Sequence, residues 1–497
     1  MFRGPVCGVD GFTLVDRLLC LASERADALA VADTEGRRLS YGGLVDRALR
    51  VARVLRGMGA GPGSSVALAP LNTVDAVVVL LGAWLAGASV VVVDAASPGE
   101  ELGFQLGMWR PRVLATHEEL AGRHCGAVER LGARCVSVER LVEEALSGER
   151  LGDWEAARPR PWDTGVVYFY AGVAGRTLPV LHSHGGLAAS AAVTVAHYGL
   201  GAEDRSFVSA PVSHALGLQI STFAPLYAGG SVVLYTKRGR LDPVHAAAAL
   251  ASSGATVVLG APGFYEALLS AGYRGHSGLR YAVSAGAPLR RETQEAWLRA
   301  TGVELLQLYG MTEAAPLTAT LPGDNPPGSV GRPMPGVEIR LVDPETLEPR
   351  GRGPGEALAR APNVMAGYGD PGETERALLP GGWLRTGDIL EADEEGHLYF
   401  RGVRKRMLKY KGYPVFPRDL ELLLESHPAV ARAVVYPVET PHGQAPGARV
   451  WLRPGARVSP EELMEWANRR LPGYKRIREL EIAGLEEGED AGRGAGE

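Results

Sequence analysis

The sequence predicts an α/β protein. We expect a large amino-terminal domain of parallel-rich sheets packed with helices, a β-rich subdomain within it, and a small mobile α+β carboxyl-terminal domain. Helical patterns alternate with short β-branched runs along the chain, which is typical of parallel sheets. The composition becomes rich in Gly and Pro near residue 320, and a basic stretch followed by a new helical pattern begins after residue 400.

The elements follow from apolar periodicity and from Gly/Pro stops. Apolar residues at three- and four-residue spacing predict helices, and short β-branched runs predict buried strands. In order, the patterns predict a strand end and a helix across 39–63, strands at 64–70 and 88–94, a strand at 255–259, a helix around 264–269, a strand at 279–284 and a helix at 290–301.

One run, residues 76–93, is long and apolar enough to span a bilayer. Internal glycines and the flanking Asp75 and Asp94 instead favour a buried helix ending near Gly87, followed by a buried strand. The first twenty residues contain no basic segment followed by a clean apolar stretch, so we expect no secretory signal and no membrane span.

The changes in composition near residues 320 and 400 give the expected domain boundaries. We predict a large domain over residues 1–401, with its β-rich subdomain at about 320–400, and a small domain over 402–483 that begins near 401–404. The acidic, glycine-rich residues 484–497 contain too few apolar groups to pack, so they are predicted to be a disordered tail.

Composition excludes several classes of function. The 497 residues carry 52 basic and 57 acidic groups, a net charge of -5, which gives no electrostatic case for binding nucleic acid. The four cysteines form no C-x-x-C pair, so a reducing cytoplasm is the simplest location. Scarce Asn and Gln fit heat adaptation, although a GC-rich genome explains the arginine bias equally well.

Short motifs at predicted strand ends point to a nucleotide. Tyr309-Gly310-Met311-Thr312-Glu313 follows an apolar strand, and the carboxyl edges of open α/β sheets bind ligands. Glu313 could hold Mg²⁺, which prefers oxygen ligands shared with phosphates. For the pentapeptide alone, a solvated loop above a packed aromatic side chain is the simpler interpretation.

Two further motifs are weak singly. Asp388, in Thr386-Gly387-Asp388, follows a short strand and could accept both hydroxyls of a ribose. The small residues 284–288 could let a backbone approach a flat base closely.

The order and spacing of the motifs decide the interpretation. The turn at 284–288, YGMTE at 309–313, GWLRTGD at 382–388 and KYKGYPVFPRDLE at 409–421 resemble the adenylate-forming superfamily. That superfamily includes acyl-CoA synthetases, peptide-synthetase adenylation domains and firefly luciferase. The resemblance covers roughly residues 10–480 and is closest in type to fatty-acid or other acyl-CoA ligases.

The resemblance implies a two-step reaction that uses ATP, Mg²⁺ and coenzyme A. A carboxylate attacks the α-phosphate of ATP and forms an acyl-adenylate, and a thiol then displaces AMP after the small domain rotates on a hinge. The implied catalytic residues are Thr312, Glu313, His214 and Lys409, with Glu313 as metal ligand. Gly286, Ala287, Pro288, Tyr309, Gly310, Thr312 and Asp388 would bind the nucleotide, Lys409, Lys411 and Gly412 would serve the thioester step, and Arg406 would be the hinge.

The chain departs from the family at its phosphate loop. Such loops hold phosphate with hydroxyls, backbone N–H groups and a lysine, and here Gly172, Gly175, Arg176 and Thr177 remain while Leu178 stands at the lysine position. Arg176 is a candidate replacement charge, although arginine's planar fork does not replace an ammonium directly. A turn without a phosphate role is the alternative.

Other departures lie near the hinge and at the end of the chain. Val403 replaces an arginine that supports the ribose, and Arg404 could reach the ribose only if the turn slips. A hinge needs backbone freedom more than one side chain, so Arg406 can replace the usual aspartate. No lysine follows Lys475, so the lysine of the family's Pro-x-Thr-x-x-Gly-Lys ending is missing, and losing such a cation typically costs ~10²–10³ in rate.

The residues support two hypotheses of different class. The first is an acyl-CoA synthetase-like ligase with a weakened adenylation step, acting on a carboxylic acid, ATP and coenzyme A. The second is an impaired relative that binds adenine nucleotide or acyl-CoA as a sensor or partner subunit. A peptide-synthetase adenylation domain is weaker, because no carrier domain and no acidic anchor for an ammonium are evident. The sequence specifies neither the acyl group nor the oligomeric state.

Overall fold

The computed structural model describes residues 13–170, 177–239, 241–404, 408–410, 413–415, 417–440, 443–471 and 475–483. The chain divides into two compact units, residues 1–338 with 359–384, and residues 339–358 with 385–497. Alternating helices and mostly parallel strands in the first unit confirm the α/β class. The domain boundary near 401–404 stays a prediction.

One sheet of the first unit has seven strands in the order β18-β8-β7-β4-β3-β5-β6. Strands β7, β4, β3, β5 and β6 are mutually parallel, whereas β8 is antiparallel to both β7 and β18. The bounds are β3 (Ser65–Ala69), β4 (Ser89–Val92), β5 (Val113–Thr116), β6 (Arg134–Ser137), β7 (Thr164–Tyr170), β8 (Leu178–Ser183) and β18 (Gly367–Tyr368).

The second sheet of this unit carries eight of the predicted site residues, in its strands or in the loops that follow them. Its strands follow the order β2-β1-β10-β9-β11-β12-β13-β14-β15, and the strands from β1 to β13 along this path are parallel. The bounds are β1 (Leu29–Asp33), β2 (Arg38–Ser40), β9 (Arg205–Val208), β10 (Ser231–Leu234), β11 (Val257–Gly260), β12 (Tyr281–Ala285), β13 (Leu305–Met311), β14 (Ala314–Ala319) and β15 (Ser329–Pro333).

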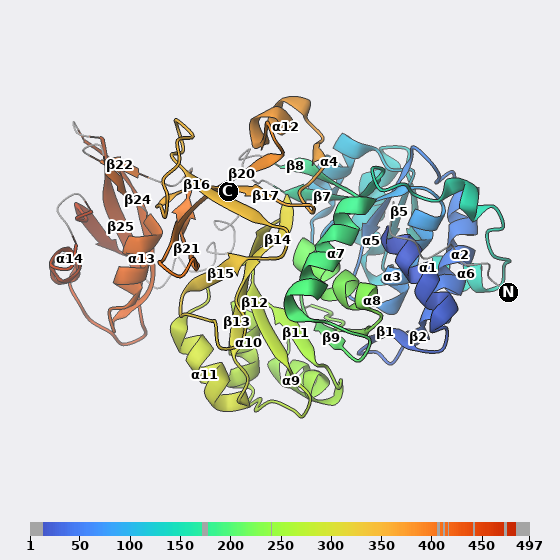
Figure 1. Cartoon of the computed structure of the whole chain (residues 1–497), viewed down its shortest axis with the longest axis horizontal. Coiled ribbons are helices and arrows are strands. Elements are labelled where there is room, and N and C mark those ends of the chain that lie inside the picture. The colour runs from blue at the N-terminus through green and yellow to red at the C-terminus, as the bar shows by residue number, and fades with distance from the viewer. Residues whose placement is uncertain are drawn as a thin grey trace. The chain divides into compact units, whose positions relative to one another are not determined.

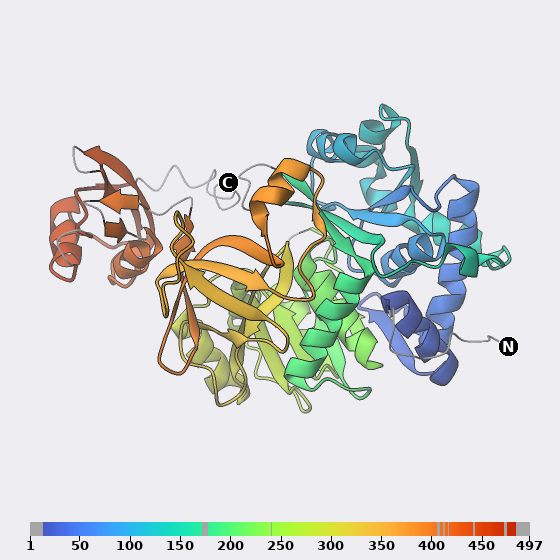
Figure 2. The same cartoon turned by 45° about the horizontal axis from the view of Figure 1, so that its top comes forward.

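Helices connect and cover these strands, and α9, α10 and α11 lie along β11–β13 in both views (Figure 1 and Figure 2). The helices and remaining short elements of this unit are α1 (Leu14–Glu24), α2 (Tyr41–Gly57), α3 (Val74–Leu85), α4 (Gly99–Trp109), α5 (Glu118–Glu129), α6 (Val138–Leu146), a 3₁₀ turn (Trp154–Ala157), α7 (His184–Tyr198), a π-helix (Leu216–Phe223), α8 (Ala224–Ala228), α9 (Pro243–Ser252), α10 (Pro262–Ser270), α11 (Arg291–Thr301), α12 (Pro371–Ala377) and β19 (Leu378–Leu379).

The second unit contains two groups of paired strands and two helices among its described residues. Strands β16, β17, β20 and β21 are adjacent in that order, and a second sheet has the order β23-β22-β25-β24 with β26 paired to β25. The bounds are β16 (Glu338–Val342), β17 (Gly355–Arg360), β20 (Trp383–Ala392), β21 (Leu398–Val403), β22 (Leu408–Tyr410), β23 (Tyr413–Val415), α13 (Pro417–Glu425), β24 (Val430–Thr440), β25 (Gly443–Leu452), α14 (Pro460–Asn468) and β26 (Glu479–Ile482).

The apolar run at 76–93 folds as predicted into a buried helix and strand. Helix α3 starts at a Thr73 cap, whose side chain accepts a hydrogen bond from the Ala76 N–H, and every residue of the helix is buried. Gly87 turns with φ +88°, and β4 then pairs with β3 and β7. Within the described residues no helix is long and apolar enough to cross a membrane.

A disulfide joins Cys125 of α5 to Cys135 of β6, with Cα atoms 5.4 Å apart. The sequence analysis did not predict this bond, because the cysteines are widely spaced and form no recognisable motif. The turn at 130–133 folds β6 back beside α5, so two residues ten positions apart meet. Disulfides are rare in cytosolic proteins except those of hyperthermophiles, so a cytoplasmic location stays a prediction.

Candidate functional site

Predicted site residues follow three parallel strands of one sheet. His214 follows β9, residues 286–288 follow β12 and residues 312–313 follow β13, while residues 261–264 follow β11. Because β9, β11, β12 and β13 are neighbours and parallel, their carboxyl ends lie on a single edge. The structure therefore brings these segments together.

The turn predicted to contact adenine lies at this edge. Ala285 pairs with Leu308 across β12 and β13, so residues 286–288 leave the sheet beside Tyr309. Gly286 has φ +81° and open space where a Cβ would stand, which favours glycine through backbone conformation rather than crowding. Residues 286–288 are exposed and Tyr309 is half-buried, as a surface that receives a flat ligand requires.

Glu313 is the most constrained of the predicted residues. Its side chain is fully buried, and Tyr368 Oη donates a 2.7 Å hydrogen bond to Oε1. Burial raises the pKa of this carboxyl, although the Tyr368 hydrogen bond acts in the opposite direction. The other oxygen, Oε2, has no hydrogen-bond partner within the described part of the chain. A buried carboxylate oxygen without a partner is suited to a cation.

His214 lies in the loop after β9. Its Nε2 is 3.8 Å from Asp94 Oδ2, and both side chains are about half exposed. The following residues form a π-helix, an element that is frequent at functional sites, and Gly217 is required there because a Cβ would lie 2.1 Å from the Pro211 carbonyl oxygen. Period-based reasoning predicts α-helices and strands, so it did not find the π-helix.

Asp388 belongs to the second unit, on β20. It pairs directly with Val403 of β21, and its backbone N–H donates to Thr386 Oγ at 3.1 Å. Arg404 lies 3.6 Å from a Glu345 oxygen and 3.9 Å from a Glu356 oxygen. Arg404 directly follows the last residue of β21, and the idea that it reaches the ribose stays a prediction.

The phosphate loop and the thioester segment are only partly described. Gly172, Gly175 and Arg176 lie outside the described residues, as do Lys411, Gly412, Arg406 and the tail from residue 484. Leu178 is 4% exposed and pairs with Tyr170 in the β7–β8 hairpin. Thr177 is half-buried, and the Lys409 backbone pairs with Pro414 in β22–β23.

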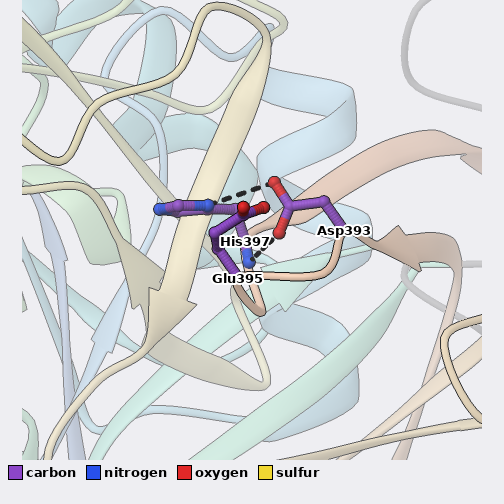
Figure 3. A group of neighbouring side chains, drawn as sticks. All are labelled: Asp393, Glu395 and His397. Carbon is purple, nitrogen blue, oxygen red and sulfur yellow. Dashed lines mark hydrogen bonds and ion pairs between the residues drawn. The ribbon is translucent and has the colours of Figure 1, made fainter.

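A turn in the second unit brings together Asp393, Glu395 and His397 (Figure 3), whose ligand-type atoms all lie within 4.8 Å of one another. Asp393 accepts hydrogen bonds from the His397 N–H at 2.8 Å and from Tyr399 Oη at 3.1 Å. The His397 ring lies 3.1 Å from the same carboxylate. These contacts close the hairpin between β20 and β21, so we assign the group a structural role.

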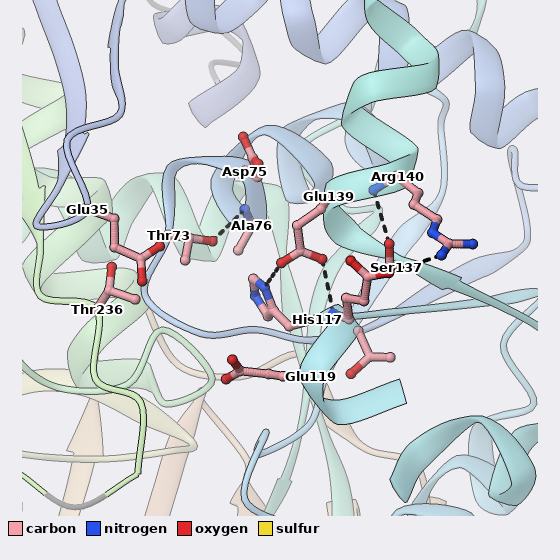
Figure 4. Close-up of polar contacts among 12 residues, drawn as sticks. Glu35, Thr73, Asp75, Ala76, His117, Glu119, Ser137, Glu139, Arg140 and Thr236 are labelled. Carbon is pink, nitrogen blue, oxygen red and sulfur yellow. Dashed lines mark hydrogen bonds and ion pairs between the residues drawn. The ribbon is translucent and has the colours of Figure 1, made fainter. Parts of the chain in front are cut away.

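Another polar network lies where α5 and α6 begin (Figure 4). His117 Nδ1 is 2.6 Å from Glu139 Oε1, and Arg238 binds Glu35 as well as Glu119. Burial opposes ionisation of Glu139, but hydrogen bonds from His117 and the backbone outweigh it and lower its pKa to about 2. Each of these acids is paired with a base, so the network joins elements of the fold.

A parallel sheet with these segments at its carboxyl edge defines a ligand-binding α/β enzyme. The chain belongs to the AMP-binding enzyme family, which matches residues 21–369, and the AMP-binding enzyme C-terminal domain matches residues 419–486. The predicted membership of the adenylate-forming superfamily is confirmed. The prediction that the enzyme class is acid–thiol ligase is confirmed with it.

Named relatives and solved structures agree with that membership. The chain is 31% identical to a 4-coumarate–CoA ligase-like protein of Oryza sativa subsp. japonica, over 92% of this chain and 80% of the relative. It is 29% identical to a feruloyl-CoA synthase of Amycolatopsis sp, over 90% of each chain. A benzoate CoA ligase from Burkholderia xenovorans superposes with a TM-score of 0.84 at 27% identity, over 95% of this chain and 96% of that chain.

Proposed function

We propose that this chain is an acyl-CoA synthetase that converts a carboxylic acid, ATP and coenzyme A to acyl-CoA, AMP and pyrophosphate. The observation that carries the proposal is the shared carboxyl edge of β9, β11, β12 and β13, which is followed by the segments that contain His214, residues 286–288 and Glu313. Asp388 of the second unit would bind the ribose hydroxyls.

The first step forms the acyl-adenylate. A substrate carboxylate oxygen attacks the α-phosphorus, the bond to the bridging oxygen breaks, and pyrophosphate leaves with both electrons. Residues 286–288 and Tyr309 would hold adenine, and the Thr312 hydroxyl would donate a hydrogen bond to a phosphate oxygen. Holding the carboxylate and ATP in the reacting orientation lowers the entropic part of the activation free energy.

Glu313 would hold Mg²⁺ through Oε2, the buried oxygen that lacks a hydrogen-bond partner in the described residues. When bound, Mg²⁺ would supply positive charge beside the phosphates of ATP. Glu313 has no cationic side chain among its described hydrogen-bond partners, so its carboxylate is left available for such an ion.

The second step transfers the acyl group. The sulfur of coenzyme A attacks the acyl carbon, the carbon–oxygen bond to AMP breaks, and AMP leaves as the thiol proton is lost. Lys409, Lys411 and Gly412 are the residues that we assign to this step, with Arg406 as the hinge on which the small domain would turn.

The acyl group is proposed to be an aromatic or other apolar acid. His214, residues 260–264 and the small Ala315 and Pro316 would line its pocket. Relatives named for 4-coumarate, ferulate and benzoate support an aromatic ring over a fatty chain.

A second candidate, an impaired relative that senses adenine nucleotide or acyl-CoA, is favoured by one observation. The position of the family's loop lysine is taken by Leu178, a buried strand residue, so this position offers no charge to phosphate.

If the chain is instead a ligase whose defect lies only in adenylation, a supplied acyl-adenylate should yield acyl-CoA faster than ATP and free acid do.

Exchange of labelled pyrophosphate into ATP tests the proposal. Purified protein should catalyse exchange with at least one member of a panel of aryl, fatty and amino acids, most strongly with aryl acids. Nucleotide binding without exchange, and without conversion of any acyl-adenylate in the panel, would support the sensor. Strong exchange with amino acids alone would support a peptide-synthetase domain.

A further inference from the structure

We propose that Tyr368 and His182 are positioning residues that fix the orientation of Glu313 and tie it to the strand that leaves the phosphate loop. This inference rests on the proposed function, because it assigns Glu313 as the ligand of a divalent cation. Neither residue belongs to a motif from which the sequence analysis predicted a site.

The carboxylate of Glu313 is held at one oxygen and left open at the other. Tyr368 Oη donates to Oε1 at 2.7 Å, whereas Oε2 has no hydrogen-bond partner among described residues. The hydrogen bond to Oε1 restricts rotation of the carboxylate, so Oε2 is held in one orientation. The Glu313 backbone is fixed as well, because its carbonyl accepts a 2.7 Å hydrogen bond from the Met365 N–H.

His182 holds the residue before Glu313. Its Nε2 lies 2.7 Å from the Thr312 carbonyl oxygen, and since a carbonyl can only accept, Nε2 carries the proton. His182 is fully buried, and burial lowers the pKa of its imidazole to about 4. At neutral pH the uncharged ring of His182, on β8, therefore donates a hydrogen bond to the backbone of Thr312, the residue before Glu313.

Both contacts converge on the β8–β18 pair. Tyr368 pairs with Val180, and Gly367 with Leu181, in antiparallel register. Strand β8 starts at Leu178, directly after the phosphate-loop segment, and it carries His182. This antiparallel pair of strands thus holds residues 312–313 through Tyr368 and His182.

A preoriented ligand matters because Mg²⁺ demands near-ideal octahedral geometry. Residues that orient a metal ligand typically change metal affinity by roughly 10- to 100-fold when they are mutated. The hydroxyl of Tyr368 and the Nε2–H of His182 are the atoms predicted to have this effect, rather than the bulk of either ring.

The test measures binding of Mn²⁺–ATP to the full chain by water proton relaxation, with Mn²⁺ in place of Mg²⁺. Tyr368→Phe and His182→Leu should each weaken binding by about tenfold or more. His182→Gln, which keeps an N–H near the Nε2 position, should recover most of the loss. Tyr198→Phe is the matched control, since it removes a buried hydroxyl that has no hydrogen-bond partner in the described structure.

A second measurement separates positioning from folding. In pyrophosphate exchange, raising Mg²⁺ should restore the Tyr368→Phe rate toward wild type, which lost packing could not explain, and thermal unfolding should show that Tyr368→Phe and the Tyr198→Phe control are both folded at the assay temperature. Wild-type affinity for Mn²⁺–ATP in Tyr368→Phe, or in Glu313→Gln, would overturn the inference. An absence of exchange by the wild-type chain would count against the proposed function alone, because the Mn²⁺ titration does not depend on it.

Discussion

Val403 lies directly opposite Asp388 in the antiparallel pair of β20 and β21. An apolar side chain therefore neighbours the carboxylate that we assign to the ribose, where the family carries an arginine. A bulge between the pairs Ile389–Gly402 and Leu390–Phe400 leaves Arg401 as the extra residue, and bulges re-aim side chains. Arg401 nevertheless turns to Glu391, with Nε 2.8 Å from Oε2. Among the described contacts, Arg401 and Arg404 each face acids of the second unit.

Replacing Asp388 by alanine should weaken AMP binding by roughly 1.5–3 kcal/mol, the range for a hydrogen bond to a charged group. Isothermal calorimetry measures this change directly. Glu394→Ala is a suitable control, because Glu394 is an acid of the same unit that is 85% exposed and pairs only loosely with Arg352 at 3.2 Å. An absence of adenine-nucleotide binding by the wild-type protein would remove the ligase and the nucleotide sensor, and would leave only a sensor of acyl-CoA.

Introducing the missing arginine should have the reverse effect. Val403→Arg is expected to tighten AMP binding by about threefold to tenfold, which corresponds to the net value of a typical hydrogen bond. The side chain of residue 403 is half-buried, so a guanidinium can extend from it. Unchanged affinity in this variant, with Asp388→Ala still impaired, would show that ribose binding here uses Asp388 alone.

The sequence predicted the fold well where local patterns and tertiary packing agree. The helix and strand at 76–93 and the helix at 290–301 follow from local patterns, and the parallel pairing of the strands at 255–259 and 279–284 follows from the helix between them. It did not predict contacts that depend on distant segments meeting. Tyr368 and Glu313 are 55 positions apart, His182 and Thr312 are 130 apart, and no local pattern links either pair.

Acid should weaken the His117–Glu139 pair. The pKa of Glu139 is lowered in the folded state from 4.5 to about 2, so its contribution is complete above about pH 5 and is lost as the pH falls toward 2. Glu139→Gln should therefore cost roughly 2 kcal/mol at pH 7 and almost nothing at pH 2. Urea unfolding across this pH range measures the difference in free energy of unfolding between wild type and Glu139→Gln. Glu143→Gln is the control, because Glu143 is an exposed residue of the same helix. A pH-independent difference would assign the effect to packing.

The Cys125–Cys135 bond should contribute measurably to stability. A closed loop of this length restricts the unfolded chain by roughly 2–3 kcal/mol in the chain-entropy account. Cys135→Ser should lower the unfolding temperature, and a reductant should lower the wild type to the same value while leaving the variant unchanged. Mass spectrometry of alkylated protein without reduction reports whether the two thiols are joined. Full alkylation at both positions would contradict the disulfide.

The final prediction concerns the cation of the adenylation step. The ending after Lys475 contains no lysine, and Gly492-Arg493 is its one pair of a glycine followed by a basic residue. Grafting a Pro-x-Thr-x-x-Gly-Lys ending after residue 482 should raise pyrophosphate exchange at least tenfold, because one transition-state cation is worth roughly 3–4 kcal/mol. The same graft with alanine in place of its lysine is the control. If the native chain already exchanges rapidly, Arg176→Ala, tested first, and Lys475→Ala, tested second, should identify which side chain replaces the lysine, with a loss of about 10²–10³ for the one that acts. A graft that folds and binds AMP normally without any gain would place the defect in residues 171–180 and favour the sensor.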